Sequence, residues 1–313
     1  MSPLPYPSRR QRGRRALASL GGAALLAAGL APAAAQSGPE SLGPAGPQDV
    51  ATPVTSDDLT SAGVATVPGQ WFVELPGRVS TAGGTQKALK AAQQALAREA
   101  RSAGTVTVER TFGALWNGAT VSGTENEVRR VAAAAGASAV YPVAVVDAPE
   151  PLEGEQPDLE TALPMTGADI VHSELGHTGD GVRVAIMDTG IDYDHPDLGG
   201  DGTDGGAFPN DRVVAGYDFV GDSFNADPSN PAYDPVPQPD ADPDDCQGHG
   251  THVAGIVGAS GELTGVAPEV DLGAYRVFGC NGSTTADIMI AAMEQALADD
   301  MDVRSSDLSA RPS

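Results

Sequence analysis

The stretch VAIMDTGID, residues 184–192, decides the fold of this chain. It continues an almost unbroken apolar run over residues 182–187, which is typical of a strand buried on both faces of a parallel sheet. The run ends at Asp188. Polar groups that do chemistry in such sheets gather at the carboxyl ends of the strands, so Asp188 is a candidate for a functional site.

The second informative stretch is GHGTHVAG, residues 248–255, which begins a helix of small residues that continues to Gly258. Its glycines predict close packing, with Gly248 and Gly250 around His249 and Gly255 against a neighbouring element. Two alternatives stay open for these residues. Asp188 could be structural, and His249 with His252 could form a metal-ligand pair, although no Glu lies between them as in zinc proteases.

Taken together, the two stretches resemble the first two catalytic segments of the subtilisin-like serine proteases, the subtilase or peptidase S8 family. The resemblance implies a catalytic triad in which Asp188 orients an imidazole and His249 acts as general base. The third segment of that family reads like Gly-Thr-Ser-Met-Ala and carries the nucleophilic serine. This sequence contains no such segment, so we expect a secreted serine endopeptidase whose Asp and His are present, whose Ser is absent, and which is inactive as given.

The region around these motifs alternates strands and helices. Strands are expected at residues 182–187, at 270–277 and from 301 to 303, and helices at 249–258 and 284–297. This pattern predicts an α/β fold with a subtilisin-like doubly wound parallel sheet, here incomplete, over residues 165–303. Residues 304–313 depart from the family's next strand because they read Arg-Ser-Ser-Asp and then Pro. We therefore interpret them as an aberrant tail, of the kind that a frameshift or a truncation would produce.

Residues 69–148 predict a separate α+β domain. Strands are expected at 70–75, 106–112, 114–121 and 137–147, and helices at 86–103 and 125–135. The order β-α-β-β-α-β is the ferredoxin-like or split βαβ plan. It resembles the inhibitory I9-type propeptide of subtilisin-like proteases, which implies a zymogen whose own propeptide is an intramolecular inhibitor. Residues 149–164 would then be the linker and processing region.

The N-terminus reads as a targeting segment. Basic residues precede a run of small apolar residues, and Ala33-Ala34-Ala35 resembles a cleavage site, so residues 1–35 are a predicted signal peptide. The alternative is a membrane anchor, but the apolar run is short for a span of about 20 residues. Residues 36–68 predict a disordered linker. We expect a secreted, extracellular protein with no stable membrane span once the signal is removed.

Charge and cysteine content narrow the partners further. The net charge of −24 and the isoelectric point near 4.3 exclude nucleic acid as a partner, because phosphate binding needs clustered Lys and Arg. The resemblance to subtilisin-like proteases implies a protein or peptide substrate and the chain's own propeptide as partners. Cys246 and Cys280 are the only two cysteines and would meet an oxidising compartment. We predict a disulfide between the two cysteines, and two free thiols are the alternative.

Two further predictions concern binding. Gly282 and Ser283 match a family segment that pairs with the main chain of the substrate as an edge strand, although an ordinary loop would serve equally well there. Asp197 matches a calcium ligand of some family members, and the acidic stretch 201–245 would also suit calcium. The loop 259–264, where partner ligands would lie, is short. No cofactor is required for the expected chemistry, and calcium remains a candidate.

Two other functions compete with proteolysis. Residues 70–148 could act by themselves as a protease inhibitor or a folding chaperone. The chain could also be a secreted protein that binds calcium or carbohydrate.

Overall fold

The computed structural model describes residues 59, 61, 63–149 and 159–306, the last three by their backbone alone. The chain divides into two units, Met1–Ala51 and Thr52–Ser313, and every described residue belongs to the second. The predicted signal peptide, residues 36–58 of the predicted linker, residues 150–158 and residues 307–313 of the predicted tail lie outside the described residues. Among those described, no helix combines the length and the apolar character that a membrane crossing needs.

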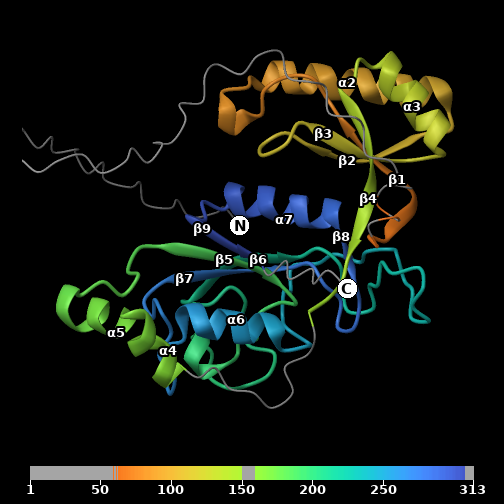
Figure 1. Ribbon diagram of the computed structural model, residues 1–313. Coiled ribbons are helices and arrows are strands. Elements are labelled where there is room, and N and C mark those ends of the chain that lie inside the picture. Colours follow the sequence, from red (N-terminus) through yellow and green to blue (C-terminus); the bar gives the residue numbers. More distant parts are fainter. Residues whose placement is uncertain (1–58, 60, 62, 150–158, 307–313) are drawn as a thin grey trace, which may run out of the picture. The chain divides into compact units, whose positions relative to one another are not determined.

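The first part of the second unit has the predicted order β-α-β-β-α-β (Figure 1). Its elements are β1 (Thr66–Glu74), α2 (Gln86–Ala103), β2 (Thr107–Phe112), β3 (Gly118–Ser122), α3 (Glu125–Ala134) and β4 (Ala139–Val146), with a short 3-10 helix η1 (Ser80–Ala82) after β1. The strands pair antiparallel in the order β2-β3-β1-β4. The split βαβ prediction is therefore confirmed at the level of elements and pairing.

Capping residues lie at the start of both helices of this part and at the end of α2. The Thr85 side chain accepts a hydrogen bond from the Ala88 amide at the start of α2, and Gly104 ends that helix in the left-handed conformation. Thr124 and Glu127 form a capping box at the start of α3. The apolar faces of the helices pack on the sheet around Trp71, Leu96, Val121, Val128 and other buried side chains.

The second part is built on a parallel sheet, as predicted. Its strands are β5 (Arg183–Asp188), β6 (Val213–Asp218), β7 (Asp271–Arg276) and β9 (Val303–Ser306), in the order β6-β7-β5-β9. Helix α6 (His249–Gly258) covers one face, and α7 (Ala286–Ala298) covers the other (Figure 1). Before the sheet lie three short helical segments, α4 (Leu159–Thr166), α5 (Ala168–Ile170) and η2 (Val171–Leu175).

Strand β5 shows why the apolar run is unbroken. Val184 and Ile186 point into the cluster that contains Ala254 of α6, whereas Ala185 and Met187 point into the cluster that contains Ala292 of α7. Alternate residues thus face opposite helices, and both sets are almost fully buried. A strand covered on both faces cannot show the apolar and polar alternation of a half-exposed one.

The structure corrects several boundaries. The break expected at Arg304 is wrong, because β9 continues through Ser306 and pairs in parallel with β5 as far as Met187. Backbone pairing at the edge of the sheet needs no apolar side chain, so a polar sequence can continue the strand there. Strand β6 was not predicted at all; it lies within the acidic stretch 201–245.

Other limits shift by a few residues. The linker predicted to end at residue 68 gives way to β1 at Thr66, and the one predicted to end at 164 gives way to α4 at Leu159, which is buried. Thr284–Thr285 forms the short strand β8 and α7 begins after it, two residues later than expected. Strand β3 begins at Gly118 instead of residue 114, because Glu294 binds the preceding amides of Gly113, Ala114 and Leu115.

Candidate active site

Asp188 and His249 meet at the carboxyl end of β5. Asp188 is the last residue of that strand and His249 the first of α6, and their exposed fractions are 2% and 7%. His249 Nδ1 lies 2.8 Å from Asp188 Oδ1. The same carboxylate oxygen accepts the Thr189 amide at 2.8 Å. An imidazole held in this way by a buried carboxylate has its tautomer and orientation fixed through Nδ1.

Asp245 holds the start of α6. Its carboxylate accepts the amides of Gln247, Gly248 and Thr251, each at 2.9 Å, and the Thr251 hydroxyl at 2.6 Å. Burial raises the pKa of Asp245, but these hydrogen bonds outweigh burial and lower it below its ordinary value. A charged carboxylate at a helix N-terminus also complements the helix dipole. Asp245 therefore holds the backbone at the start of α6, which carries His249.

The glycines around His249 act differently from one another. Gly248 has a φ of 104°, in the left-handed region, so its conformation favours glycine although no atom crowds it. A Cβ on Gly250 would lie 2.1 Å from the Gly190 carbonyl oxygen, which confirms the predicted close approach. The packing role expected for Gly255 is wrong, because a Cβ there would meet no atom within 4 Å.

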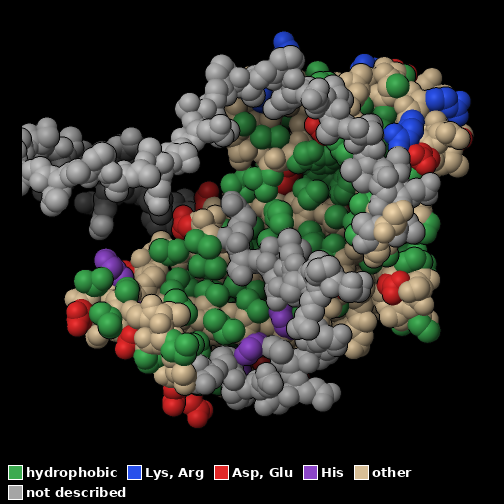
Figure 2. All heavy atoms as spheres, in the orientation of Figure 1, with side chains coloured by type: hydrophobic (Ala, Val, Ile, Leu, Met, Phe, Trp, Pro, Cys, Tyr) green, Lys and Arg blue, Asp and Glu red, His purple; other side chains and the backbone are tan. Residues whose placement is uncertain are grey.

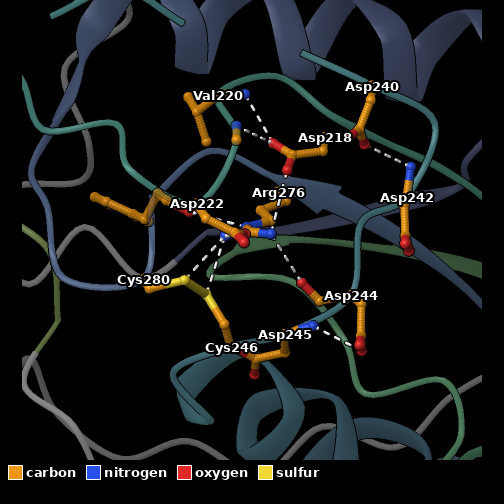
Figure 3. Close-up of polar contacts among 12 residues, drawn as sticks. Asp218, Val220, Asp222, Asp240, Asp242, Asp244, Asp245, Cys246, Arg276 and Cys280 are labelled. Atoms are coloured by element: carbon orange, nitrogen blue, oxygen red, sulfur yellow. Dashed lines mark hydrogen bonds and ion pairs between the residues drawn. A yellow bond between two sulfur atoms is a disulfide. The ribbon is translucent and has the colours of Figure 1, made fainter. Parts of the chain in front are cut away.

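The disulfide predicted between Cys246 and Cys280 is present. It joins the segment just before His249 to the loop after β7. Figure 3 shows the Arg276 guanidinium beside both sulfur atoms, with Asp218, Asp222 and the Asp244 carbonyl around it. The free-thiol alternative is therefore wrong for the described chain.

The segment predicted to bind substrate lies beside β4. A Cβ on Gly282 would lie 2.1 Å from the Phe224 carbonyl oxygen, and the Ser283 carbonyl accepts the Ala226 amide at 2.9 Å. The next two residues, β8, pair antiparallel with Val145 and Val146 at the end of β4. The substrate role of Gly282 and Ser283 remains a prediction, whereas their place next to an extended strand is an observation.

The side chains that were candidates for metal ligands form hydrogen bonds within the protein. Both carboxylate oxygens of Asp197 accept backbone amides, from Glu262 at 2.8 Å and Leu263 at 3.0 Å, so this side chain holds the short loop 259–264. His249 commits its Nδ1 to Asp188. Within residues 63–149 and 159–303, the one group of three ligating side chains is Asp222, Cys246 and Cys280, whose sulfurs are bonded to each other.

Sequence reasoning missed several residues that shape the site. Asp245 and Gln247 position His249 through the start of α6, and Gln247 also donates from Nε2 to the Pro149 carbonyl at 2.8 Å. Glu294 and Arg276 bind main chain and side chains from distant segments. The signal available for Arg276 was a cation at the end of an apolar strand, in a chain with 18 basic and 42 acidic residues.

Asp244 supplies a pH-dependent element beside the site. Burial raises the pKa of Asp244 to about 6, and the charges of Asp192, Asp242 and Asp194 add to the effect. Its folded-state pKa exceeds the ordinary 3.8. The stabilisation from the bound proton is therefore present below the ordinary value and lost as the pH rises toward the folded-state pKa.

We therefore expect Asp244→Asn to raise the melting temperature at pH 7 and to leave it nearly unchanged at pH 4. Asn keeps an acceptor for the Asp245 amide and removes the charge. Thermal unfolding followed by circular dichroism between pH 4 and pH 8 measures the effect, with Asp201→Asn at an exposed position as the matched control. A gain that is equal at both pH values would contradict the assignment.

Comparison with known proteins finds a family match over the region that contains this site. Residues 179–309 match Peptidase S8, the subtilase family. The minor extracellular protease Vpr of Bacillus subtilis (strain 168) is 36% identical over 205 residues, which are 63% of this chain and 23% of that protein. Subtilisin DY of Bacillus licheniformis is 35% identical over 145 residues, 45% of this chain and 41% of that protein.

Two further similarities cover shorter shares. The alkaline serine exoprotease A of Vibrio alginolyticus is 38% identical over 120 residues, 38% of this chain and 17% of that protein. The crystal structure of a cold adapted subtilisin-like serine proteinase matches with 35% identity and a TM-score of 0.28, covering 39% of this chain and 34% of that one. The chain thus spans less than half the length of each of these relatives. Over residues 179–309, it carries a subtilase-family domain with subtilisin-like homologues.

Proposed function

We propose that this chain is the precursor of a secreted subtilisin-like serine endopeptidase that hydrolyses peptide bonds of protein or peptide substrates. The observation that carries the proposal is the buried contact of 2.8 Å between His249 Nδ1 and Asp188 Oδ1. In this reaction, His249 Nε2 takes the proton of a serine hydroxyl and later delivers it to the leaving amine. Asp188 stabilises the imidazolium that forms in between. No step requires a cofactor.

Asp188 and His249 are two parts of a three-part catalytic apparatus. The sequence holds no segment of the Gly-Thr-Ser-Met-Ala kind, and we propose that the chain as given is inactive for that reason. Secretion is part of the same proposal and relies on the signal-like residues 1–35. Calcium takes part in no catalytic step of this proposal. A calcium-dependent rise in the melting temperature that is lost in Asp197→Asn would show that calcium has a structural role.

We further propose that residues 69–148 are an inhibitory propeptide. Strand β4 pairs with β8 through Val145 and Val146, and such antiparallel addition is how extended peptides bind an edge strand. The chain that follows stays close to the site, since Ser283 Oγ donates to Asp147 Oδ1 at 3.3 Å and Gln247 Nε2 donates to the Pro149 carbonyl. These contacts support the interpretation that residues 145–149 occupy the place of a substrate.

The charge distribution agrees with an inhibitory contact. Residues 63–149 contain eight Lys and Arg against six Asp and Glu, whereas residues 159–306 contain four against 27. On the face shown in Figure 2, Lys and Arg side chains gather over α2 and α3. Opposite net charges favour association and raise its rate at low ionic strength. The inhibitor part would therefore be drawn to the acidic catalytic part.

Labelling with a serine-directed fluorophosphonate tests the proposal. We expect the secreted product of the whole gene to be labelled and to hydrolyse a peptide substrate, and His249→Ala to abolish both. The chain of 313 residues alone should give neither. Labelling of the 313-residue chain would show that it carries a nucleophilic serine after all. Failure of the whole gene product to hydrolyse peptides would overturn the proposed function.

The second candidate is a protease inhibitor or folding chaperone that acts through residues 69–148. The pairing of β4 with β8 favours it as well. It predicts that the purified chain slows hydrolysis by an added subtilisin, and that it does so equally well with His249→Ala. A chain that has no effect on the added protease would exclude this candidate.

A further inference from the structure

Arg276 is a buried cation next to the catalytic pair. It is the last residue of β7, its exposed fraction is 3%, and it lies opposite Asp188 in the register of the two strands. The Val277 amide, one residue on, donates to the Asp188 carbonyl at 2.9 Å. A buried charge is stable only when it is well paired and hydrogen-bonded, so its partners show which segments it must hold in place.

The guanidinium binds acceptors from several segments of chain (Figure 3). Two are carboxylates, Asp218 Oδ2 at 3.2 Å and Asp222 Oδ1 at 2.8 Å. Two are carbonyl oxygens, those of Asp244 and Phe278, both at 3.2 Å. One cation thereby joins the end of β6, the loop after it, the segment before α6 and the loop after β7.

The same guanidinium also contacts the disulfide. Its NH2 nitrogen lies 3.0 Å from Cys246 Sγ and 3.5 Å from Cys280 Sγ. Cys246 precedes His249 by three residues, and Cys280 precedes Gly282 by two. The bond therefore ties the segment that carries the proposed base to the segment proposed to bind substrate, and Arg276 anchors that bond to the strand beside Asp188.

We propose that Arg276 is a positioning residue of the Asp188–His249 pair, and that it makes the Cys246–Cys280 disulfide a reducible switch of that pair's geometry. Cys246 is exposed and Cys280 half-buried, so a thiol in solution can reach the bond. The inference deepens the proposed function, because it concerns the same two residues.

The redox step is an ordinary thiol–disulfide exchange with an external dithiol. One thiolate of the dithiol attacks Cys246 Sγ, forms a mixed disulfide and releases the Cys280 thiolate. The second thiolate of the dithiol then displaces the Cys246 thiolate, so the dithiol is oxidised to its disulfide and the two cysteines are reduced. Arg276 faces both leaving thiolates, and a neighbouring cation lowers thiol pKa values and speeds departure.

A role in thiolate stabilisation and a merely structural role predict opposite effects on the reduction rate. Removal of the cation takes away the charge that stabilises the leaving thiolates and should slow reduction by dithiothreitol about 3- to 10-fold. If Arg276 only supported the fold, its loss would loosen the loops and speed reduction. The test uses a double variant, Arg276→Met combined with Asp218→Asn. The second substitution is included because the buried Asp218 carboxylate would otherwise lose the cation that pairs with it. Arg276→Lys, which keeps the charge, should stay near the wild-type rate and serves if the double variant does not fold.

Two readouts on the purified, oxidised chain test the inference. Alkylation and mass measurement give the reduction rate under native conditions. Nuclear magnetic resonance of the ring protons of the five histidines reports on the geometry of the Asp188–His249 pair. The His249 signals are assigned by their loss in His249→Ala. Arg212→Met is the matched control, because Arg212 also binds carbonyl oxygens, those of Val270 and Gly258, without contact to the sulfurs.

We expect slower reduction in the double variant and a shift of the His249 Nδ1 proton when the wild-type disulfide is reduced. Reduction that is faster or unchanged without Arg276, or a His249 resonance insensitive to both reduction and Arg276, would overturn the inference. Neither readout requires peptide hydrolysis. A chain that fails the peptidase test can therefore still pass this one, and the two failures are distinguishable.

Discussion

Asp188→Asn is expected to lower kcat/KM for peptide hydrolysis by about 10⁴-fold, the scale seen when a triad carboxylate is replaced by an amide. Asp188 Oδ1 accepts from both the Thr189 amide and His249 Nδ1, so an Asn whose oxygen takes this place keeps both contacts and the local fold but carries no charge. An Asn whose NH2 group takes this place donates to the imidazole and holds the ring in the wrong tautomer. It also leaves the imidazolium without a counter-charge.

The measurement is steady-state hydrolysis of a peptide by the secreted product of the whole gene. Asp192→Asn is the matched control, because Asp192 is a nearby carboxylate whose Oδ1 accepts the Asp194 amide at 3.1 Å, an acceptor that Asn keeps. We expect this control to retain nearly the wild-type kcat/KM. A loss below about tenfold in Asp188→Asn, in a variant that unfolds normally, would remove Asp188 from the proposed mechanism.

Glu294→Ala is expected to release the loop 113–115 from α7. The Glu294 carboxylate accepts the amides of Gly113, Ala114 and Leu115, at 3.1, 2.7 and 2.9 Å to Oε1. Hydrogen bonds to a charged group contribute about 1.5–3 kcal/mol each, and the amides would lose their acceptor together. Amide hydrogen exchange at Ala114 and Leu115 should therefore speed up by about 10²-fold.

Hydrogen exchange of the intact chain measures this opening directly. Gln295→Ala is the control on the same helix, because Gln295 is exposed and bonds only within α7 and its end, to Asp299. Glu294→Gln, which keeps one acceptor oxygen but no charge, should give an intermediate rate. Unchanged exchange in Glu294→Ala would mean that these amides are protected by other contacts, and that Glu294 does not hold the proposed inhibitor in place.

Local sequence was sufficient for much of this fold. The apolar run before Asp188 predicted a strand covered on both faces, and Thr85, Thr124 and Gly104 lie at helix ends as their chemistry requires. The positions of Asp188 and His249 followed from short motifs. In each case, the information lies within a few residues, because periodicity and capping are properties of neighbouring backbone.

The strands that the sequence failed to predict depend instead on residues far away in the chain. Strand β6 has too little alternation to stand out within an acidic stretch, and it exists because β7 pairs with it. Strand β9 continues past Arg304 because β5 offers its backbone groups. A strand of weak local signal is decided by the hydrogen-bonding partner beside it, and that partner lies far away in the sequence.

The sequence alone therefore determined the two catalytic candidates, the split βαβ plan and the parallel sheet, and it favoured the pairing of Cys246 with Cys280 without excluding free thiols. Only the tertiary structure decided what surrounds them: Arg276 between the disulfide and β6, and Glu294 on the amides of a loop some 180 residues earlier. A motif records which groups the chemistry needs. Whether a charge is buried, and which distant groups satisfy it, depends on how the chain packs, because desolvation and pairing are set by the folded surroundings.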